Sequence, residues 1–169
     1  MHIIAQTQRF VIRNFKPDEE EAYLSLFDDE QVLMHIPKRS RKENMNIFRI
    51  ALNDYAAGKT LGRWGLFNNG DNAFIGLCLL KNFNGEADKI ELGYVLSRKY
   101  WGKGIASEMV HKMIAYAFTH TNAHELVAIT TLGNIASQRV LEKAGFKRMD
   151  NIISAGEEIA YFKIEKQSL

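Results

Sequence analysis

IELGYVLSRKYWGKGIASEMVHKMIAYAFTH, residues 90–120, predicts a strand, a glycine loop and a helix in direct succession. The strand is expected at residues 90–96, and the loop is WGKG at residues 101–104. Apolar side chains then recur every three or four positions, which indicates a helix with one apolar face. Glycines allow positive φ and a close approach of backbone N–H groups to a ligand, and a helix start adds unpaired donors and partial positive charge. This stretch therefore predicts a phosphate-binding site.

The composition around this stretch is that of an ordinary globular protein. The chain has 169 residues, of which 46% are hydrophobic and 25% charged, so one domain can bury a core without disulfides or metal. A net charge of +2 is too small to indicate nucleic acid as a partner. The single cysteine, Cys78, lies in an apolar run, which favours a buried thiol in a reducing compartment. The sequence shows no leader segment and no membrane-spanning run, so we expect a cytoplasmic protein.

Toward the amino terminus, the pattern predicts helical segments and an antiparallel meander. Pro17 and the four acidic residues after it favour the start of a helix, and a short helix or turn is expected at residues 31–36. A capping box from Ser40 to Glu43 begins a further helix, which Gly58 ends. The predicted strands lie at residues 9–15, 61–67, 73–80 and 89–96, with hairpin turns at Asn69-Gly70 and Asn84-Gly85.

Toward the carboxyl terminus, residues 125–131 predict a strand parallel to the one at residues 89–96, because a helix carries the connection. Asn134 is expected to cap a helix that runs to residue 143 and ends at Gly145. Two more strands are expected, at residues 146–153 and 158–164. The whole pattern predicts an α/β fold with a mixed, mostly antiparallel sheet of about six or seven strands, flanked by about four helices.

Three motifs occur in order along the chain: QRFVIR at residues 8–13, IELGY leading into YWGKGIASE at residues 90–108, and NIASQRVLEKAGF at residues 134–146. Together they resemble the GNAT superfamily of acetyl-CoA-dependent N-acetyltransferases. Within it the chain is similar to the RimJ/RimL-type group, which includes ribosomal-protein N-terminal acetyltransferases. The resemblance implies a single GNAT-type domain over residues 1–169, in which the strand before the glycine loop splays from its parallel neighbour.

The resemblance also implies acetyl-CoA as cosubstrate. The family's pyrophosphate loop, (Gln/Arg)-x-x-Gly-x-(Gly/Ala), falls on residues 99–104, where Lys99 replaces the first residue and keeps a positive charge. The pantetheine arm is expected along the end of the splayed strand, and Asn134 resembles the asparagine that contacts this arm. The cofactor-binding residues so implied are Tyr94, Val95, Leu96, Lys99, Trp101, Gly102, Lys103, Gly104, Ile105, Ala106, Asn134 and Ser137.

Acetyl transfer from a thioester to an amine requires a base for the amine proton and a proton for the departing thiolate. Glu91 is the candidate base, directly or through a water. The alternative is a solvated or salt-bridged strand residue, with Lys89 or Arg98 nearby. Many family members carry a tyrosine where this chain has Leu141. The resemblance therefore implies that Ser137, one helical turn earlier, assists as a hydrogen-bond donor to the thiolate, and a purely capping role for it is the alternative.

Other patterns indicate less specific roles. The loop lacks the third glycine of a dinucleotide-binding fingerprint and the Gly-Lys-Ser/Thr of a P-loop. His120 and His124 lack a third ligand of matching kind, so no metal site is predicted. The basic run at residues 38–42 is either solvated or contacts an anionic partner. Trp64 is either a core residue or part of an acceptor groove.

The sequence therefore predicts an N-acetyltransferase whose acceptor is a primary amine, in the first place a protein N-terminal α-amino group. A small amine, such as a polyamine, an amino sugar or an amino-acid derivative, is an alternative acceptor. A non-catalytic acetyl-CoA-binding sensor is the alternative of a different class. The expected partners are acetyl-CoA and the amine, without membrane or nucleic acid, and exposed strand edges leave room for a homodimer.

Overall fold

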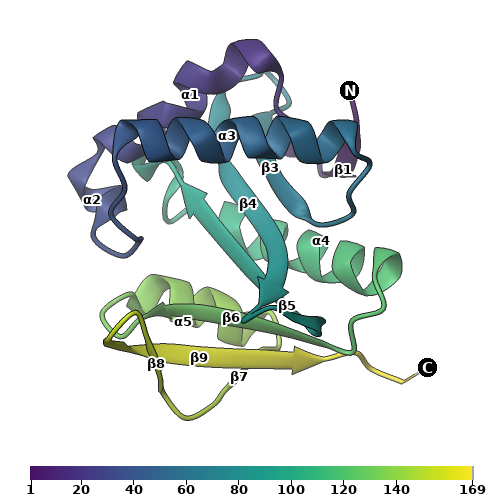
Figure 1. Cartoon of the computed structure of the whole chain (residues 1–169), viewed down its shortest axis with the longest axis vertical. Helices are drawn as coiled ribbons and strands as arrows, with labels where there is room; N and C mark the ends of the chain where they lie inside the picture. Colours follow the sequence, from purple (N-terminus) through teal and green to yellow (C-terminus); the bar gives the residue numbers. More distant parts are fainter. Residues whose placement is uncertain (169) are drawn as a thin grey trace. The chain divides into compact units, whose positions relative to one another are not determined.

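A computed structural model describes residues 1–168. These residues form two compact units, each described by itself. The first unit comprises Met1–Leu79 and Tyr94–Lys103, and the second comprises Leu80–Gly93 and the described residues from Gly104 onward. Figure 1 labels two long strands, β4 (Phe74–Phe83) and β5 (Glu86–Leu96). By their residue numbers, each of them contributes to both units.

The strands of the first unit follow the order β1-β2-β3-β4-β5. β2 pairs antiparallel with β1 on one side and with β3 on the other. β1 was not predicted, because its three consecutive apolar residues show no alternation and stand beside no turn signal. The first three strands are β1 (Ile3–Gln6), β2 (Phe10–Arg13) and β3 (Gly62–Asn68).

The helices of the first unit begin where the sequence predicts them. The capping box at the start of α3 is confirmed: Ser40 Oγ accepts a hydrogen bond from the Glu43 N–H (3.1 Å), and the Glu43 carboxylate accepts one from the Ser40 N–H (2.6 Å). α1 and α3 lie next to each other in Figure 1. The helical segments are the 3₁₀ turns Pro17–Glu19 and Leu26–Asp28, and the α-helices α1 (Glu20–Ser25), α2 (Glu30–Leu33) and α3 (Arg41–Ala56).

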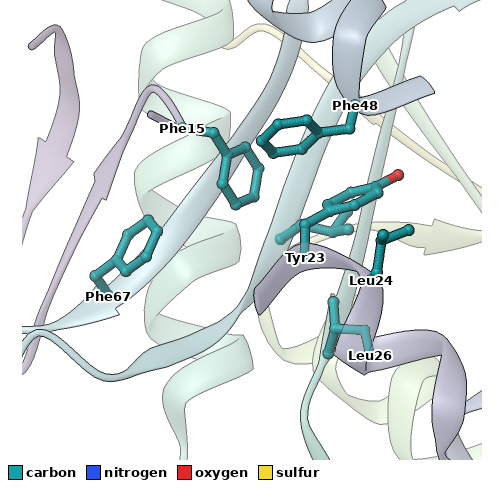
Figure 2. Close-up of a cluster of buried hydrophobic side chains, with 7 residues drawn as sticks. Phe15, Tyr23, Leu24, Leu26, Phe48 and Phe67 are labelled. Atoms are coloured by element: carbon teal, nitrogen blue, oxygen red, sulfur yellow. The ribbon is translucent and has the colours of Figure 1, made fainter. Parts of the chain in front are cut away.

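An aromatic cluster forms the core of the first unit. Phe15 lies at its centre, with ring centroids 5.6 Å from Tyr23, 5.4 Å from Phe48 and 6.0 Å from Phe67. Figure 2 shows these rings grouped between the helices and the strands. Because aromatic rings bury large apolar areas and favour tilted or edge contacts, this cluster fixes α1 and α3 on the sheet. Its buried members are Phe15, Tyr23, Leu24, Leu26, Phe48, Phe67 and Leu77.

The strands of the second unit follow the order β4-β5-β6-β9-β7, and β8 also pairs with β9. β6 (Glu125–Thr131) has the predicted bounds and the predicted parallel pairing with β5, through Lys89, Ile90 and Glu91. Among the described residues this pairing ends at Glu91, although β5 continues to Leu96. The parallel pair therefore splays after Glu91. The remaining strands are β7 (Lys147–Arg148), β8 (Ile152–Ser154) and β9 (Glu157–Glu165).

Two helices complete the second unit. α4 (Ile105–His120) buries the predicted apolar face, and α5 (Ile135–Lys143) begins at its predicted cap, Asn134. Within residues 1–168 the structure has nine strands and five α-helices. The strand number exceeds the predicted six or seven because β1 was missed and one predicted strand is divided. The prediction of a mixed, mostly antiparallel α/β fold is confirmed.

Two predictions of local structure were wrong. The strand expected at residues 146–153 is divided into β7 and β8, both paired with β9, with Met149–Asn151 between them. The turn at Asn69-Gly70 is a longer loop over residues 69–72, closed by the hydrogen bond from the Asn68 N–H to the Ala73 carbonyl (2.9 Å), and the positive φ falls on Asn72 (57°). The Asn84-Gly85 turn is confirmed, with φ of 50° and 75°.

Candidate functional site

The glycine loop begins in the first unit with a 3₁₀ turn, Arg98–Tyr100. The Tyr100 N–H donates to the Ser97 carbonyl (2.9 Å), and the Trp101 indole N–H donates to the Leu96 carbonyl (2.9 Å). Lys99 Nζ and Lys103 Nζ lie 4.9 Å and 5.7 Å from the Tyr100 ring centroid. The start of the loop is therefore rigid, and it carries two cations beside one ring.

Both glycines adopt the left-handed backbone conformation that the sequence indicated. Gly102 has φ of 68°, and Gly104, the N-cap of α4, has φ of 77°. A Cβ built on Gly102 meets nothing within 4 Å, so glycine is needed there for its backbone angle and not for space. The first helical bond of α4 runs from the Glu108 N–H to the Gly104 carbonyl (3.2 Å), so the amides before Glu108 precede the helical ladder. These amides suit an anionic ligand such as a diphosphate.

One long-range contact on the loop was not predicted. Arg9 Nη1 donates a hydrogen bond to the Lys103 carbonyl at 2.6 Å. Arg9 belongs to the QRFVIR motif, so the sequence marked the residue without indicating its partner. The other arginine near the loop, Arg98, pairs with Asp29 (3.0 Å).

Glu91 lies in the second unit, on the paired part of β5. Its neighbours Ile90 and Leu92 are buried, while its own side chain is 12% exposed, so the alternation predicted for the strand is confirmed. Lys81 Nζ lies 3.5 Å from Glu91 Oε2. The alternative of a salt-bridged Glu91 therefore fits the structure, but with Lys81 as the partner, since Lys89 pairs with Glu86 and Arg98 pairs with Asp29. Glu91 is thus a nearly buried carboxylate with one exposed cation beside it.

Asn134 and Ser137 lie in the first turn of α5. The Asn134 side-chain oxygen accepts a hydrogen bond from the Ser137 N–H (3.2 Å), which confirms the capping role of Asn134. Leu141, at the position where many family members carry tyrosine, is 1% exposed and packs in the core. Its side chain therefore offers no donor to replace the phenol, and Ser137 lies one helical turn earlier.

The residues predicted to bind acetyl-CoA are divided between the units by chain position. Tyr94 to Lys103 belong to the first unit, and Gly104 to Ala106 belong to the second with Asn134. Tyr94 and Val95 are half-buried, Leu96 and Ile105 are buried, and Trp101 is exposed. The loop and the start of α4 are consecutive in the chain, so the proposed amide donors form one uninterrupted segment.

The contacts of the remaining candidate residues are those of residues with a structural role. Trp64 is 2% exposed and is a core residue. Cys78 is buried, and this burial raises the pKa of its thiol. The His120 ring stacks on Tyr116, with centroids 4.4 Å apart. In the basic run, Arg41 pairs with Glu21 (2.7 Å).

Two kinds of feature are missing from the part of the chain that the structure describes. Within residues 1–168 no three His, Cys, Asp or Glu side chains are grouped so that they could hold a metal ion. None of the helices in the same range combines the length and the apolar character needed to cross a membrane.

Comparisons with known proteins agree with this geometry. The sequence profile of the acetyltransferase (GNAT) domain matches residues 9–147. The uncharacterized N-acetyltransferase p20 of Bacillus licheniformis is 26% identical over 145 residues, which cover 84% of this chain and 81% of that protein. The putative ribosomal N-acetyltransferase YdaF of Bacillus subtilis is 28% identical over 103 residues, or 57% of this chain and 56% of that protein. A solved acetyltransferase (GNAT family) from Bacillus anthracis has a TM-score of 0.81 at 25% identity, covering 97% of this chain and 98% of that one.

Proposed function

The chain belongs to the acetyltransferase (GNAT) family, and we propose that it moves an acetyl group from acetyl-CoA to a protein N-terminal α-amino group. The family assignment shows that the protein is an N-acetyltransferase. The finer proposal, which covers the acceptor and the role of each residue, is supported by the site and by the sequence motifs. We also propose that the protein acts in the cytoplasm.

The observation that carries this proposal is the glycine loop. Gly102 and Gly104 adopt left-handed angles directly before a helix of 16 residues. The Trp101 N–H is used within the 3₁₀ turn, so the amides of residues 102–106 are the ones available to a diphosphate, and Lys99 and Lys103 add positive charge. Acetyl-CoA carries such a diphosphate, and it supplies the reactive thioester.

The chemistry requires that the amine attack as a neutral nucleophile. Glu91 is proposed to take the amine proton, directly or through one water, while the new N–C bond forms and the C–S bond breaks. Its side chain is 12% exposed, so an amine or one water can still reach the carboxylate. Lys81, whose Nζ lies 3.5 Å from Glu91 Oε2, is proposed to hold that carboxylate in place.

The departing thiolate requires a hydrogen-bond donor. Ser137 is proposed to supply it, because Leu141 has no polar group and a hydroxyl is a competent donor although a weak acid. The thiolate proton then comes from solvent or from the proton that Glu91 removed. Ser137 thus stabilises developing charge without a net change in its own protonation.

Two observations favour a protein N-terminus as acceptor. The motifs resemble the RimJ/RimL-type group, and YdaF, a putative ribosomal N-acetyltransferase, is similar to this chain. Small amines are the second candidate, because the family assignment leaves the identity of the amine open. A homodimer formed through exposed strand edges stays a prediction.

An acceptor panel tests the proposal. Purified protein would be given acetyl-CoA with peptides that begin in Ser or Ala, with the same peptides blocked at the N-terminus, and with polyamines and amino sugars. Release of CoA thiol and mass spectrometry would identify the acetylated nitrogen. We expect acetylation of free peptide N-termini only. Acetylation of small amines alone would show that the acceptor is a small amine and not a protein N-terminus. Binding of acetyl-CoA without turnover on any amine would favour a non-catalytic acetyl-CoA-binding sensor.

A further inference from the structure

The QRFVIR motif contains an arginine whose contact the proposed function does not yet use. Arg9 and Lys103 are separated by 94 positions, yet Arg9 Nη1 donates to the Lys103 carbonyl at 2.6 Å. Both residues belong to the first unit. A charged donor on a backbone carbonyl is among the stronger kinds of hydrogen bond in proteins, so this contact restrains the loop.

Arg9 itself is fixed by the turn between β1 and β2. Thr7 Oγ1 accepts hydrogen bonds from the N–H groups of Arg9 (3.1 Å) and Phe10 (3.1 Å). The Arg9 carbonyl accepts the Asn69 N–H (3.0 Å), and Asn69 Nδ2 donates to the Thr7 carbonyl (2.8 Å). Phe10, the next residue, is fully buried. The backbone that carries the guanidinium is therefore held from two sides.

The Lys103 carbonyl, which Arg9 restrains, lies at a position that determines the direction of the next N–H group. The 3₁₀ turn holds the loop as far as Trp101, whose N–H donates to the Arg98 carbonyl (3.0 Å). The Arg9 bond holds the following part, at Lys103. A trans peptide is planar, so its C=O and the next N–H point in opposite directions. Fixing the Lys103 carbonyl therefore fixes the direction of the Gly104 N–H, at a residue whose φ of 77° only glycine adopts readily.

We propose that Arg9 is a positioning residue for the diphosphate of acetyl-CoA: it holds the Lys103–Gly104 peptide so that the Gly104 N–H faces the ligand. This inference rests on the proposed function, because it assumes that acetyl-CoA binds at the loop. In this role Arg9 contacts neither the thioester nor the amine. Its loss should therefore weaken binding of the diphosphate-bearing donor and leave the chemical step largely unchanged.

The experiment compares two acetyl donors in the full-length protein. Acetyl-CoA carries the diphosphate, whereas S-acetylpantetheine lacks it. The variants are Arg9→Gln, Arg9→Lys and Arg49→Gln, the last as a control that removes the same charge from an exposed position on α3. Kinetics would give kcat and KM for each donor, and calorimetry would give Kd for CoA.

Arg9→Gln is expected to raise KM for acetyl-CoA and Kd for CoA by roughly tenfold, the usual effect of losing one charged hydrogen bond. KM for S-acetylpantetheine, KM for the amine and kcat should change by less than about threefold. Arg9→Lys should lie between wild type and Arg9→Gln, because one ammonium reproduces the charge without the planar fork. Arg49→Gln should match wild type with both donors.

An equal loss with both donors would overturn the inference, since a merely structural role affects both. Unchanged acetyl-CoA kinetics in a variant that melts like wild type would overturn it as well, while the proposed function would stand. Failure of the wild type to bind CoA would overturn both together. Should the Arg9 variants melt early, Asn69→Ala provides a second test, because it loosens only the turn that carries Arg9. It should raise KM for acetyl-CoA alone, and an unchanged KM would contradict the inference.

Discussion

Arg13 and Glu19 form a buried, two-pronged ion pair: Nη1 lies 3.0 Å from Oε2 and Nη2 lies 2.7 Å from Oε1, with the Arg13 side chain only 2% exposed. The guanidinium carbon also lies 3.5 Å from the centroid of the Phe67 ring. The pair joins β2 to the turn before α1, and Asn72 Oδ1 accepts a further Arg13 hydrogen bond (3.3 Å). The Arg13 side chain therefore connects β2, the turn before α1 and the loop at Asn72, next to the Phe67 ring of the aromatic core.

Arg13→Met should lower the free energy of unfolding by about 3 kcal/mol or more, because it leaves the Glu19 carboxylate poorly solvated and without its cation. Urea denaturation followed by circular dichroism measures the change. The double variant Arg13→Met/Glu19→Gln should recover part of the loss, since no uncompensated charge stays behind. Additive losses in the double variant would show that the pair is not coupled.

The same pair predicts a dependence of stability on pH. Burial alone would raise the pKa of Glu19, but the hydrogen bonds from Arg13 and from the Lys16 N–H, with the charge of Arg13, leave it below its ordinary value. The folded pKa is thus below the unfolded value of about 4.3. The stabilisation is present above that value and is lost as pH falls through the folded pKa.

Wild type and Glu19→Gln should accordingly differ most near neutral pH, and the difference should shrink as pH falls below about 4. Urea denaturation of both proteins from pH 3 to pH 8 measures this. A difference that stays constant over the whole range would exclude a titrating contribution from Glu19.

Glu91→Gln should lower kcat by roughly a hundredfold or more, because the amide cannot accept the amine proton. Binding of CoA should stay within about twofold of wild type, since Glu91 takes no part in holding the diphosphate. Glu86→Gln is the matched control: it makes the same change on the same strand, at an exposed carboxylate paired with Lys89. Equal kcat values for the two variants would remove Glu91 from the mechanism.

Gly102→Ala should raise KM for acetyl-CoA by roughly tenfold, because alanine at φ of 68° costs about 1–2 kcal/mol and the loop amides shift to relieve it. Gly58→Ala is the control, since Gly58 has φ of 67° and equally open surroundings beyond α3. Both variants should lose similar stability in urea, but only Gly102→Ala should affect acetyl-CoA. A similar KM for both would contradict a ligand role for the loop.

Cys78 should not react with Ellman's reagent in the native protein, because it is fully buried and burial raises the pKa of its thiol. In denaturant the reagent should release one equivalent of its coloured thiolate per protein chain, in agreement with the single cysteine. Rapid native labelling would show that the strand around Cys78 opens easily. The slow reaction expected also means that the thiol-release assay measures CoA alone.

Local chemistry predicted much of the fold. The Ser40 capping box, the Asn134 cap and the apolar face of α4 each follow from residues within one or two helical turns, and the structure contains all three. The parallel pairing of β5 and β6 followed from the helix between them. These features depend on residue spacing and residue type, which a sequence displays directly.

Contacts between distant segments could not be predicted in the same way. Lys81, and not a residue beside Glu91 on its own strand, provides the cation near that carboxylate. Arg9 reaches the carbonyl of Lys103, across 94 positions. Such partners depend on strand pairing and on the folded path of the chain. β1 was missed for a similar reason, since its pairing with β2, and not its own pattern, makes it a strand.

The most direct measurement is a titration of isotopically labelled protein with CoA, followed by NMR of the backbone amides. We expect saturable shifts that are largest for the amides of residues 101–106, in a protein of 19.3 kDa that suits the method. S-acetylpantetheine should shift these amides much less, because it has no diphosphate. Saturable binding of CoA with no shifts at residues 101–106 would show that the glycine loop does not hold the diphosphate.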